Sequence, residues 1–335
     1  MSRTDDKTGT FRITATEDGL HIKDSILWLD SQRSGSLSFL SEVPEASKFA
    51  KQQIIATEET AKLLEIMRKK IKPLICQYNR PFSVGRLRME LLPSGHSLGG
   101  ASLYVESGSS SALYAPAVQI QKVPVHRGMQ LKRADTLILR ASQPEPGQSP
   151  VNRSREKDRL LRKIHEHISA DQWPLIFCRS IATAQELTQF LCKHSIPLSA
   201  HPHIYQINKI YQSYGCDLGS YASYSAKRTR KKVVLCPLLS YRHGASLPEA
   251  TRPVLIIRHR GTELPEYLQN LKSADQFELI GSSFGQDYVE IIDKVQPKEV
   301  LFFGDYARVY AEAYQHKSST ITFRALYPNA QPPLF

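Results

Sequence analysis

The sequence predicts an α/β protein built from two units, and three observations lead to this prediction. In the first 140 residues, short segments alternate apolar and polar side chains, a pattern typical of half-buried β-strands. From about residue 155, apolar strands instead alternate with helices, as in a small parallel α/β unit. Residues 142–155, between these parts, are rich in Pro, Ser and Gly, and we expect a linker there.

The first part is expected to consist mainly of strands. Residues 11–30 alternate around Asp18-Gly19, which predicts a β-hairpin. One helix is expected to begin near Glu58, with Thr57 as its N-cap and with Thr60 and Leu64 on the following turns. Further strands are expected at residues 37–40, 54–57, 86–92, 101–106, 111–118 and 136–139.

The second part opens with a basic helix over residues 155–168 and the apolar strand 173–178. The pattern then predicts a helix at 182–194 and strands at 197–200, 232–236 and 253–257. From Gln276 it predicts a strand, a helix at 286–295, a strand at 299–303 and a helix at 306–315. We find no internal repeat.

Composition limits the classes of protein that need to be considered. The chain has 335 residues, enough for two compact units, and 41% of them are hydrophobic. No apolar run reaches the ~20 residues of a membrane span, and the polar start has no signal-peptide core. Five cysteines without a CxxC pair favour reduced thiols and a cytoplasmic location. The net charge of +12 favours a polyanionic partner.

The most informative segment is residues 92–101, with the sequence LPSGHSLGGA and His96 in its middle. It resembles the GHxxG[SG]A element of metallo-β-lactamase-fold nucleases. Three further segments match patterns of the same proteins in the correct order: residues 55–60 (IATEET), residues 182–187 (ATAQEL), and His201 followed by residues 207–211 (INKIY). The chain is therefore similar to the bacterial nucleases of this fold that carry a β-CASP-like insert, which include DNA-ligase-associated exonucleases and mRNA 3′-end-processing-like proteins.

This resemblance implies a more specific fold than the residue pattern does. It implies an αββα metallo-β-lactamase-like sandwich formed by residues 1–150 together with 275–335. A smaller α/β domain, β-CASP-like and spanning residues 155–270, would be inserted into it. The active site of the nucleases lies in the cleft between these two domains.

The nucleases use two divalent metals that bridge a hydroxide, and this chain lacks most of the ligands. Their S-H-x-H-x-D-H signature falls on residues 41–47, SEVPEAS, and an acidic element falls on Arg140. The positions at which a metal-binding residue is lost are Glu42, Pro44, Ala46, Ser47, Ala117 and Gly285. His96 alone is retained. The resemblance thus implies a pseudoenzyme with no catalytic residue and no metal.

Two alternatives for metal binding stay open. Glu42, Glu45 and Asp305 offer oxygen ligands for a weak magnesium site, although Pro44 and Arg140 would share the same pocket. A residual hydrolase with zinc or manganese on His96 is the other. If neither holds, His96 is a satisfied polar group with no carboxylate beside it, and replacing it should cost on the order of 1 kcal/mol or less.

A basic cluster suggests a nucleic-acid contact. Its five cations within six residues are Lys227, Arg228, Arg230, Lys231 and Lys232, and they follow tyrosines at 205, 211, 214, 221 and 224. Cations neutralise phosphates and aromatic rings stack on unpaired bases, although a solvated loop would have the same composition. Arg140 and His201 are further candidates, unless Arg140 pairs internally with Glu42 or Glu45.

Three functions follow as hypotheses. The first is a non-catalytic subunit that binds single-stranded DNA or RNA, or acts as a scaffold, beside an active nuclease, ligase or helicase in DNA repair or RNA processing. The second is a residual metal-dependent nuclease or hydrolase. The third is a protein–protein adaptor whose basic surface meets an acidic partner. None of the three requires a membrane.

Overall fold

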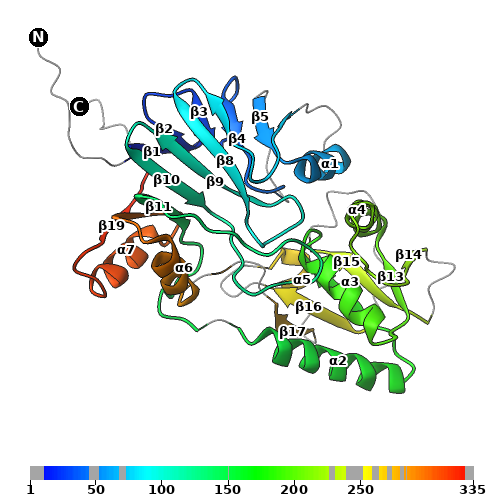
Figure 1. Ribbon diagram of the computed structural model, residues 1–335. Coiled ribbons are helices and arrows are strands. Elements are labelled where there is room, and N and C mark those ends of the chain that lie inside the picture. Colours follow the sequence, from blue (N-terminus) through cyan, green and yellow to red (C-terminus); the bar gives the residue numbers. More distant parts are fainter. Residues whose placement is uncertain are drawn as a thin grey trace, which may run out of the picture.

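The computed structural model describes residues 11–44, 53–67, 73–149, 151–225, 231–238, 252–258, 264–269, 274–279, 283 and 285–328. Their strands form three sheets, accompanied by helices (Figure 1), so the predicted α/β class is confirmed. No helix within these ranges has the length and apolar character needed to cross a membrane.

The first sheet has the order β1-β2-β3-β4-β5-β6. Its strands are β1 (Ile13–Thr16), β2 (Gly19–Ile22), β3 (Leu27–Leu29), β4 (Leu37–Phe39), β5 (Gln53–Ala56) and β6 (Leu74–Ile75). β1 and β2 are antiparallel with Thr16 opposite Gly19, which confirms the predicted hairpin. Helix α1 (Glu58–Met67) follows β5, and Thr57 caps it as predicted, since its Oγ1 accepts a hydrogen bond from Thr60 N at 3.2 Å.

The second sheet joins strands from both ends of the chain, in the order β19-β18-β11-β10-β9-β8-β7. Its strands are β7 (Phe82–Val84), β8 (Leu87–Pro93), β9 (Ala101–Ser107), β10 (Ser110–Ala115), β11 (Thr136–Arg140), β18 (Glu299–Phe303) and β19 (Thr322–Ala325). β11 and β18 are parallel neighbours, with Arg140 opposite Phe303. Helices α6 (Asp287–Val295) and α7 (Ala307–Gln315) flank β18 in sequence, as predicted.

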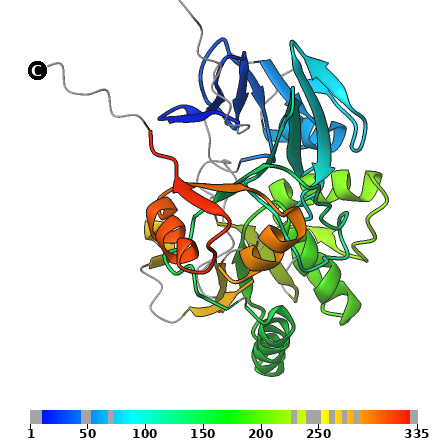
Figure 2. The same cartoon turned by 60° about the vertical axis from the view of Figure 1, so that its left-hand side comes forward.

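Successive side chains along the strands of the second sheet point to opposite faces, and both faces are buried. In β10, Tyr114 faces a core shared with first-sheet residues such as Phe39, whereas Leu113 faces a second core with α6 and α7. In β11, Ile138 and Leu139 divide in the same way. The two sheets therefore pack face to face, with α6 and α7 on the outer face of the second sheet and α1 on the outer face of the first (Figures 1 and 2).

The third sheet is parallel in all its recorded pairings and has the order β14-β13-β15-β12-β16-β17, as the prediction of a parallel α/β unit requires. Its strands are β12 (Leu175–Cys178), β13 (Leu198–Ala200), β14 (Ala222–Ser223), β15 (Val233–Pro237), β16 (Val254–Arg258) and β17 (Asp275–Glu278). Its helices are α2 (Arg153–Ser169), α3 (Thr183–Lys193), α4 (Pro202–Ser213) and α5 (Glu266–Gln269). The assignment of residues 155–270 to a separate domain stays a prediction.

Helix α4 was not predicted, and it links the third sheet to the first. Its buried Ile207 and Tyr211 join a core with Leu63 and Leu64 of α1. A hydrogen-bond network that is wholly buried holds α4 to α3: Gln185 Nε2 donates to Asn208 Oδ1 at 2.8 Å, and Asn208 Nδ2 donates to Thr188 Oγ1 at 3.2 Å. Two of the matched sequence segments thus serve this packing.

Candidate functional site

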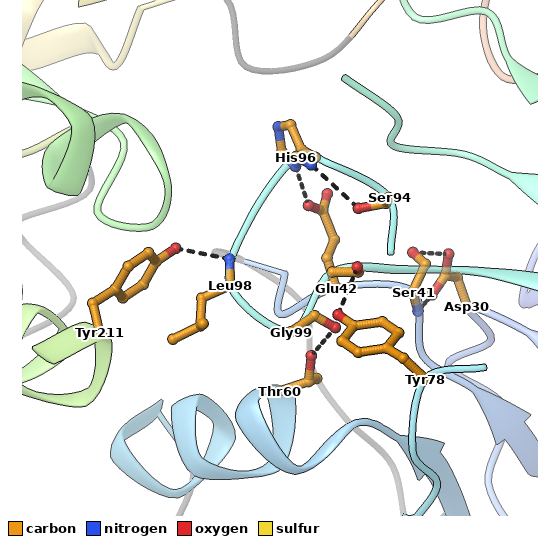
Figure 3. A network of polar contacts seen from close by, with 11 residues as sticks. Asp30, Ser41, Glu42, Thr60, Tyr78, Ser94, His96, Leu98, Gly99 and Tyr211 are labelled. Atoms are coloured by element: carbon orange, nitrogen blue, oxygen red, sulfur yellow. Dashed lines mark hydrogen bonds and ion pairs between the residues drawn. The ribbon is translucent and has the colours of Figure 1, made fainter. Parts of the chain in front are cut away.

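The loop that carries His96 connects β8 to β9 and is held by hydrogen bonds from three directions (Figure 3). Gly99 O accepts from Thr57 Oγ1 at 2.8 Å and from Thr60 Oγ1 at 2.9 Å, both at the start of α1. Tyr211 of α4 accepts from Leu98 N at 3.1 Å through its hydroxyl oxygen. The Tyr78 hydroxyl donates to Gly100 O at 2.9 Å. Since each partner comes from a different segment, the loop has a fixed position between the sheets.

Gly99 is required for this arrangement. Its φ is +77°, and a Cβ there would lie 2.5 Å from Thr60 N and 2.6 Å from Thr60 Oγ1. Only glycine combines that conformation with so close an approach to α1. The Gly-rich sequence around His96 is therefore explained by backbone geometry.

His96 lies beside a carboxylate, contrary to the prediction. Its Nδ1 is 2.6 Å from Glu42 Oε2, and its side chain is 4% exposed against 21% for Glu42. Burial alone would raise the pKa of Glu42, but His96, Arg179 and Arg140 stabilise the carboxylate and bring the pKa to about 2. Glu42, one of the two partners considered for an internal pairing of Arg140, thus pairs with His96. It could not be foreseen because the two residues lie on segments that meet only when the sheets pack.

Asp30 lies next to this pair and connects the first two sheets. It directly follows β3, and its backbone φ is +47°. Its carboxylate accepts hydrogen bonds from Ser41 N at 2.7 Å, Ser41 Oγ at 2.6 Å and the Tyr114 hydroxyl at 2.8 Å. Burial raises the pKa of Asp30, although the charge of Arg140 and these hydrogen bonds oppose the shift.

A cavity of about 220 Å³ opens beside these carboxylates. Asp30, Glu42 and Arg140 line it, together with Ser31, Gln32, Leu40, Ser41, Pro44, Pro116 and Ala117. Arg140 ends β11, and its guanidinium lies 5.3 Å from the centre of the Phe303 ring. Burial alone would lower the pKa of Arg140, but the nearby Tyr114, Asp30 and Glu42 raise it. Within the described residues, no carboxylate is close enough to Arg140 to form an ion pair with it.

Arg179 brings a second guanidinium to the same place. It follows β12 at the carboxyl end of the third sheet and is half-buried. Its charge lowers the pKa of Glu42, which requires it to lie near that carboxylate. The residues that line the cavity follow strands of the first and second sheets, and Arg179 of the third sheet acts on one of them, Glu42.

Of the other candidate positions named from the sequence, some lie at or near the cavity and others lie outside the described residues. Pro44 and Ala117 line the cavity with Glu42. Gly285 lies close to the segment after Ala117, because Ser283 N donates to Val118 O at 2.5 Å and Ser283 Oγ accepts from Ile120 N at 2.9 Å. Ala46, Ser47, Lys227, Arg228 and Arg230 lie outside the described residues, as does Glu45 of the magnesium alternative.

His201 and the described part of the basic cluster lie at opposite ends of the strands of the third sheet: His201 at the carboxyl end, Lys231 and Lys232 at the amino end. His201 follows β13 and caps α4, with its Nδ1 accepting from His203 N at 3.3 Å, and it is 1% exposed. Lys231 precedes β15 and pairs with Asp171, which precedes β12, at 3.2 Å. Lys232 is half-buried beside Lys231. Because the strands are parallel and about five residues long, Lys231 and Lys232 lie about 15 Å from the carboxyl ends of the strands, where Arg179 lies.

The side chains at the cavity do not fit the dinuclear metal centre that the resemblance implies. Two metals bridged by hydroxide need several imidazole and carboxylate ligands that converge. The described parts of the chain contain no group of three or more His, Cys, Asp or Glu residues able to hold a metal ion. Here Pro44 and Ala117 offer no ligand atom, and Arg140 adds a positive charge.

Sequence reasoning missed Asp30, Arg179 and His126. The first two had a signal, because each directly follows a buried apolar strand, and such positions meet at one edge of a sheet. His126 had none. It lies in the long segment between β10 and β11, where burial, together with the charge of His96, lowers its pKa to about 4.

Comparisons with protein families, curated proteins and solved structures place the chain among known proteins as follows. The chain matches no protein-family model. It is 21% identical over 314 residues to a probable DNA ligase from Opitutus terrae, an alignment that covers 89% of this chain but only 30% of that protein. Its fold is similar to the crystal structure of a protein of unknown function from Enterococcus faecalis V583, with a TM-score of 0.61 and 11% identity over 88% of this chain and 80% of the other.

Proposed function

We propose that this chain is a catalytically inactive protein of the metallo-β-lactamase type that binds single-stranded nucleic acid. In this proposal, residues 1–150 and 275–335 form the αββα core and residues 155–270 form a β-CASP-like insert. The two face-to-face sheets support the first assignment, with α1 on the outer face of one and α6 and α7 on the outer face of the other. The parallel sheet whose strands β12 to β16 lie within residues 155–270 supports the second, and its last strand, β17 (Asp275–Glu278), would extend the insert to Glu278.

The observation that carries the proposal is the environment of Arg140. Arg140 lines a cavity with Glu42 and Ala117, at the place where the resemblance would put a metal ligand. Glu42 is engaged by His96, which leaves Arg140 able to contact a phosphate. Guanidinium groups bind phosphate oxygens in a bidentate manner, which suits Arg140 to this contact.

The proposed partner is a DNA ligase, with an active nuclease or a helicase in the same repair reaction. The likeness to part of a probable DNA ligase supports this choice, since the matched region is only 30% of that protein and the remainder is available for the joining reaction. In the proposal, this chain holds DNA while another polypeptide or domain performs the chemistry. RNA is the alternative ligand and is tested in parallel.

Titration of labelled single-stranded DNA and RNA with the protein tests the proposal. We expect binding at micromolar protein that weakens as salt rises, because each neutralised phosphate releases counterions. Arg140→Met should weaken binding about tenfold, since it removes a charge-assisted contact. Arg308→Gln is the matched control, because Arg308 is exposed and pairs with Glu312 on α7 at 2.7 Å. Binding that is absent, or insensitive to salt and to Arg140→Met, contradicts the proposal.

Metal analysis separates this function from a residual hydrolase. Protein purified without chelator is expected to hold less than stoichiometric zinc and manganese. Stoichiometric metal that disappears in His96→Ala would support the hydrolase instead. For an adaptor, proteins recovered with the chain from its host should stay bound after nuclease treatment, while the purified chain binds neither DNA nor RNA.

A further inference from the structure

A second basic pocket lies on the third sheet, away from the Arg140 cavity. Its volume is about 530 Å³, which is large enough for a nucleotide. It lies between the first turns of α2 and the carboxyl ends of β16 and β17, which run side by side (Figure 1). Its lining residues are Gln148, Ser149, Val151, Asn152, Arg155, Glu156, Arg159, Arg258, Gln276 and Glu278.

Three arginines line this pocket, and one of them is already paired. Arg159 donates to Glu156 Oε2 at 2.8 Å and to Gln276 O at 2.6 Å, and its guanidinium lies 4.1 Å from the centre of the Phe277 ring. The bonds from Arg159 lower the pKa of Glu156, so its carboxylate stays ionised and balances the charge of Arg159. Arg159 and Glu156 therefore form a wall that carries little net charge.

Arg258 and Arg155 differ from Arg159 in lacking such partners. The Nε of Arg258 is shielded from solvent and has no hydrogen-bond partner in the described part of the chain. A buried donor of this kind is costly unless an acceptor reaches it. Arg155 is exposed on the first turn of α2, and neither guanidinium forms an ion pair with a described residue. Two guanidiniums without a described ion-pair partner thus line one cavity, which the Glu278 carboxylate opposite Arg258 also lines.

The N-terminus of helix α2 also favours an anion in this pocket. α2 has 17 residues, and Asn152 caps it by accepting a hydrogen bond from Arg155 N at 3.0 Å. The positive end of its dipole therefore points to the pocket. Ser149, Asn152 and Gln276 offer neutral donors and acceptors around the two arginines, as a sugar or base would require.

We propose that this pocket binds the phosphate of a nucleotide through Arg155 and Arg258, as a site distinct from the Arg140 cavity. Two guanidiniums and a helix N-terminus match the charge and geometry of a phosphate better than those of a single carboxylate. The nucleotide is either free or part of a nucleic-acid strand. The chemistry at the two arginines is the same in both cases.

Calorimetric titration with 5′-AMP and with inorganic phosphate tests this proposal. We expect the wild-type protein to bind AMP with a Kd of about 1 mM or lower. Arg258→Met and Arg155→Gln should each weaken AMP binding about tenfold. Arg155→Gln changes an exposed side chain and so keeps the test valid if Arg258→Met fails to fold. Arg162→Gln is the matched control, because it is exposed on α2 about 10 Å further along and does not line the pocket.

The outcomes separate this proposal from the proposed function. Arg140→Met should leave AMP affinity unchanged, and retained AMP binding in a protein that binds no single-stranded DNA would contradict only the nucleic-acid function. Competition between AMP and DNA identifies the phosphate as part of a strand, whereas independent binding identifies a free nucleotide. Absence of AMP binding at 10 mM, about tenfold above the expected Kd, or equal affinity in Arg155→Gln and the wild type, overturns the phosphate site.

Discussion

Glu42 and His96 are 54 residues apart in the chain and belong to loops that leave different sheets, yet Glu42 Oε2 lies 2.6 Å from His96 Nδ1. This pair occupies the place where the resemblance implies metal-binding residues. A carboxylate that the nucleases lack thus meets the one imidazole that is retained. The contact gives His96 a structural role that requires no metal.

The first prediction concerns acid stability. The pKa of Glu42 falls from 4.5 to about 2 in the folded protein, so its contribution to stability is complete above about pH 4.5 and is lost as the pH falls towards 2. Glu42→Gln should therefore lower the free energy of unfolding by about 2 kcal/mol at pH 7, and by much less at pH 3. Urea unfolding at both pH values measures the difference.

Glu290→Gln is the control for this experiment, because Glu290 pairs with Lys294 at the exposed surface of α6. Surface pairs of this kind contribute little. An equal loss for Glu42→Gln at pH 3 and pH 7 would show that the carboxylate does not gain stability from its charged neighbours.

The second prediction concerns His96 itself. The sequence suggested a cost of about 1 kcal/mol for His96→Ala, but the structure places Glu42 against the ring, so removal leaves a half-buried carboxylate without its hydrogen bond. We expect a loss of about 2 kcal/mol. A double-mutant cycle with Glu42→Gln should give a coupling of about 1 kcal/mol at neutral pH. Additive losses would mean that the two side chains do not interact in solution.

The third prediction concerns Arg140. Arg140→Glu should weaken single-stranded DNA binding by more than tenfold through charge reversal, and it should also lower the melting temperature, because the charge of Arg140 stabilises the carboxylates of Asp30 and Glu42. Melting curves and binding curves of the same preparation decide this. A large loss of stability that a Glu42→Arg change partly restores would instead indicate an internal ion pair. Unchanged melting and unchanged affinity would remove Arg140 from the functional account.

Most of the secondary structure follows from local pattern. The hairpin at β1–β2, the Thr57 cap and the helices α6 and α7 were predicted because periodicity and capping depend only on neighbours in sequence. Helix α4 was missed, although Pro202 at its first position and buried residues at 204, 207 and 211 are helix signals. His201 is an unusual cap, and this obscured its start.

The site was less predictable because it depends on how the sheets meet. His96 and Arg140 were named as candidates from the sequence, whereas Arg179 acts on Glu42 only through the placement of the third sheet. Lys231 was grouped with the candidate site because of its charged neighbours in sequence. In the structure Lys231 precedes β15 and pairs with Asp171, which precedes β12. Because β12 and β15 are parallel, both residues lie at the amino ends of the strands, whereas Arg179 follows β12 at the carboxyl end.

The last prediction tests whether the His96 loop depends on its close approach to α1. Gly99 and Gly108 both have positive φ, +77° and +59°, but a Cβ on Gly108 would meet nothing within 4 Å, whereas one on Gly99 would lie 2.5 Å from Thr60 N. Gly108→Ala should therefore cost only the conformational strain of about 1 kcal/mol. Gly99→Ala should cost about 3 kcal/mol or more, because α1 must shift and weaken the bonds from Thr57 and Thr60 to Gly99 O. Urea unfolding of the two variants gives the comparison, and equal losses would mean that the loop yields without disturbing α1.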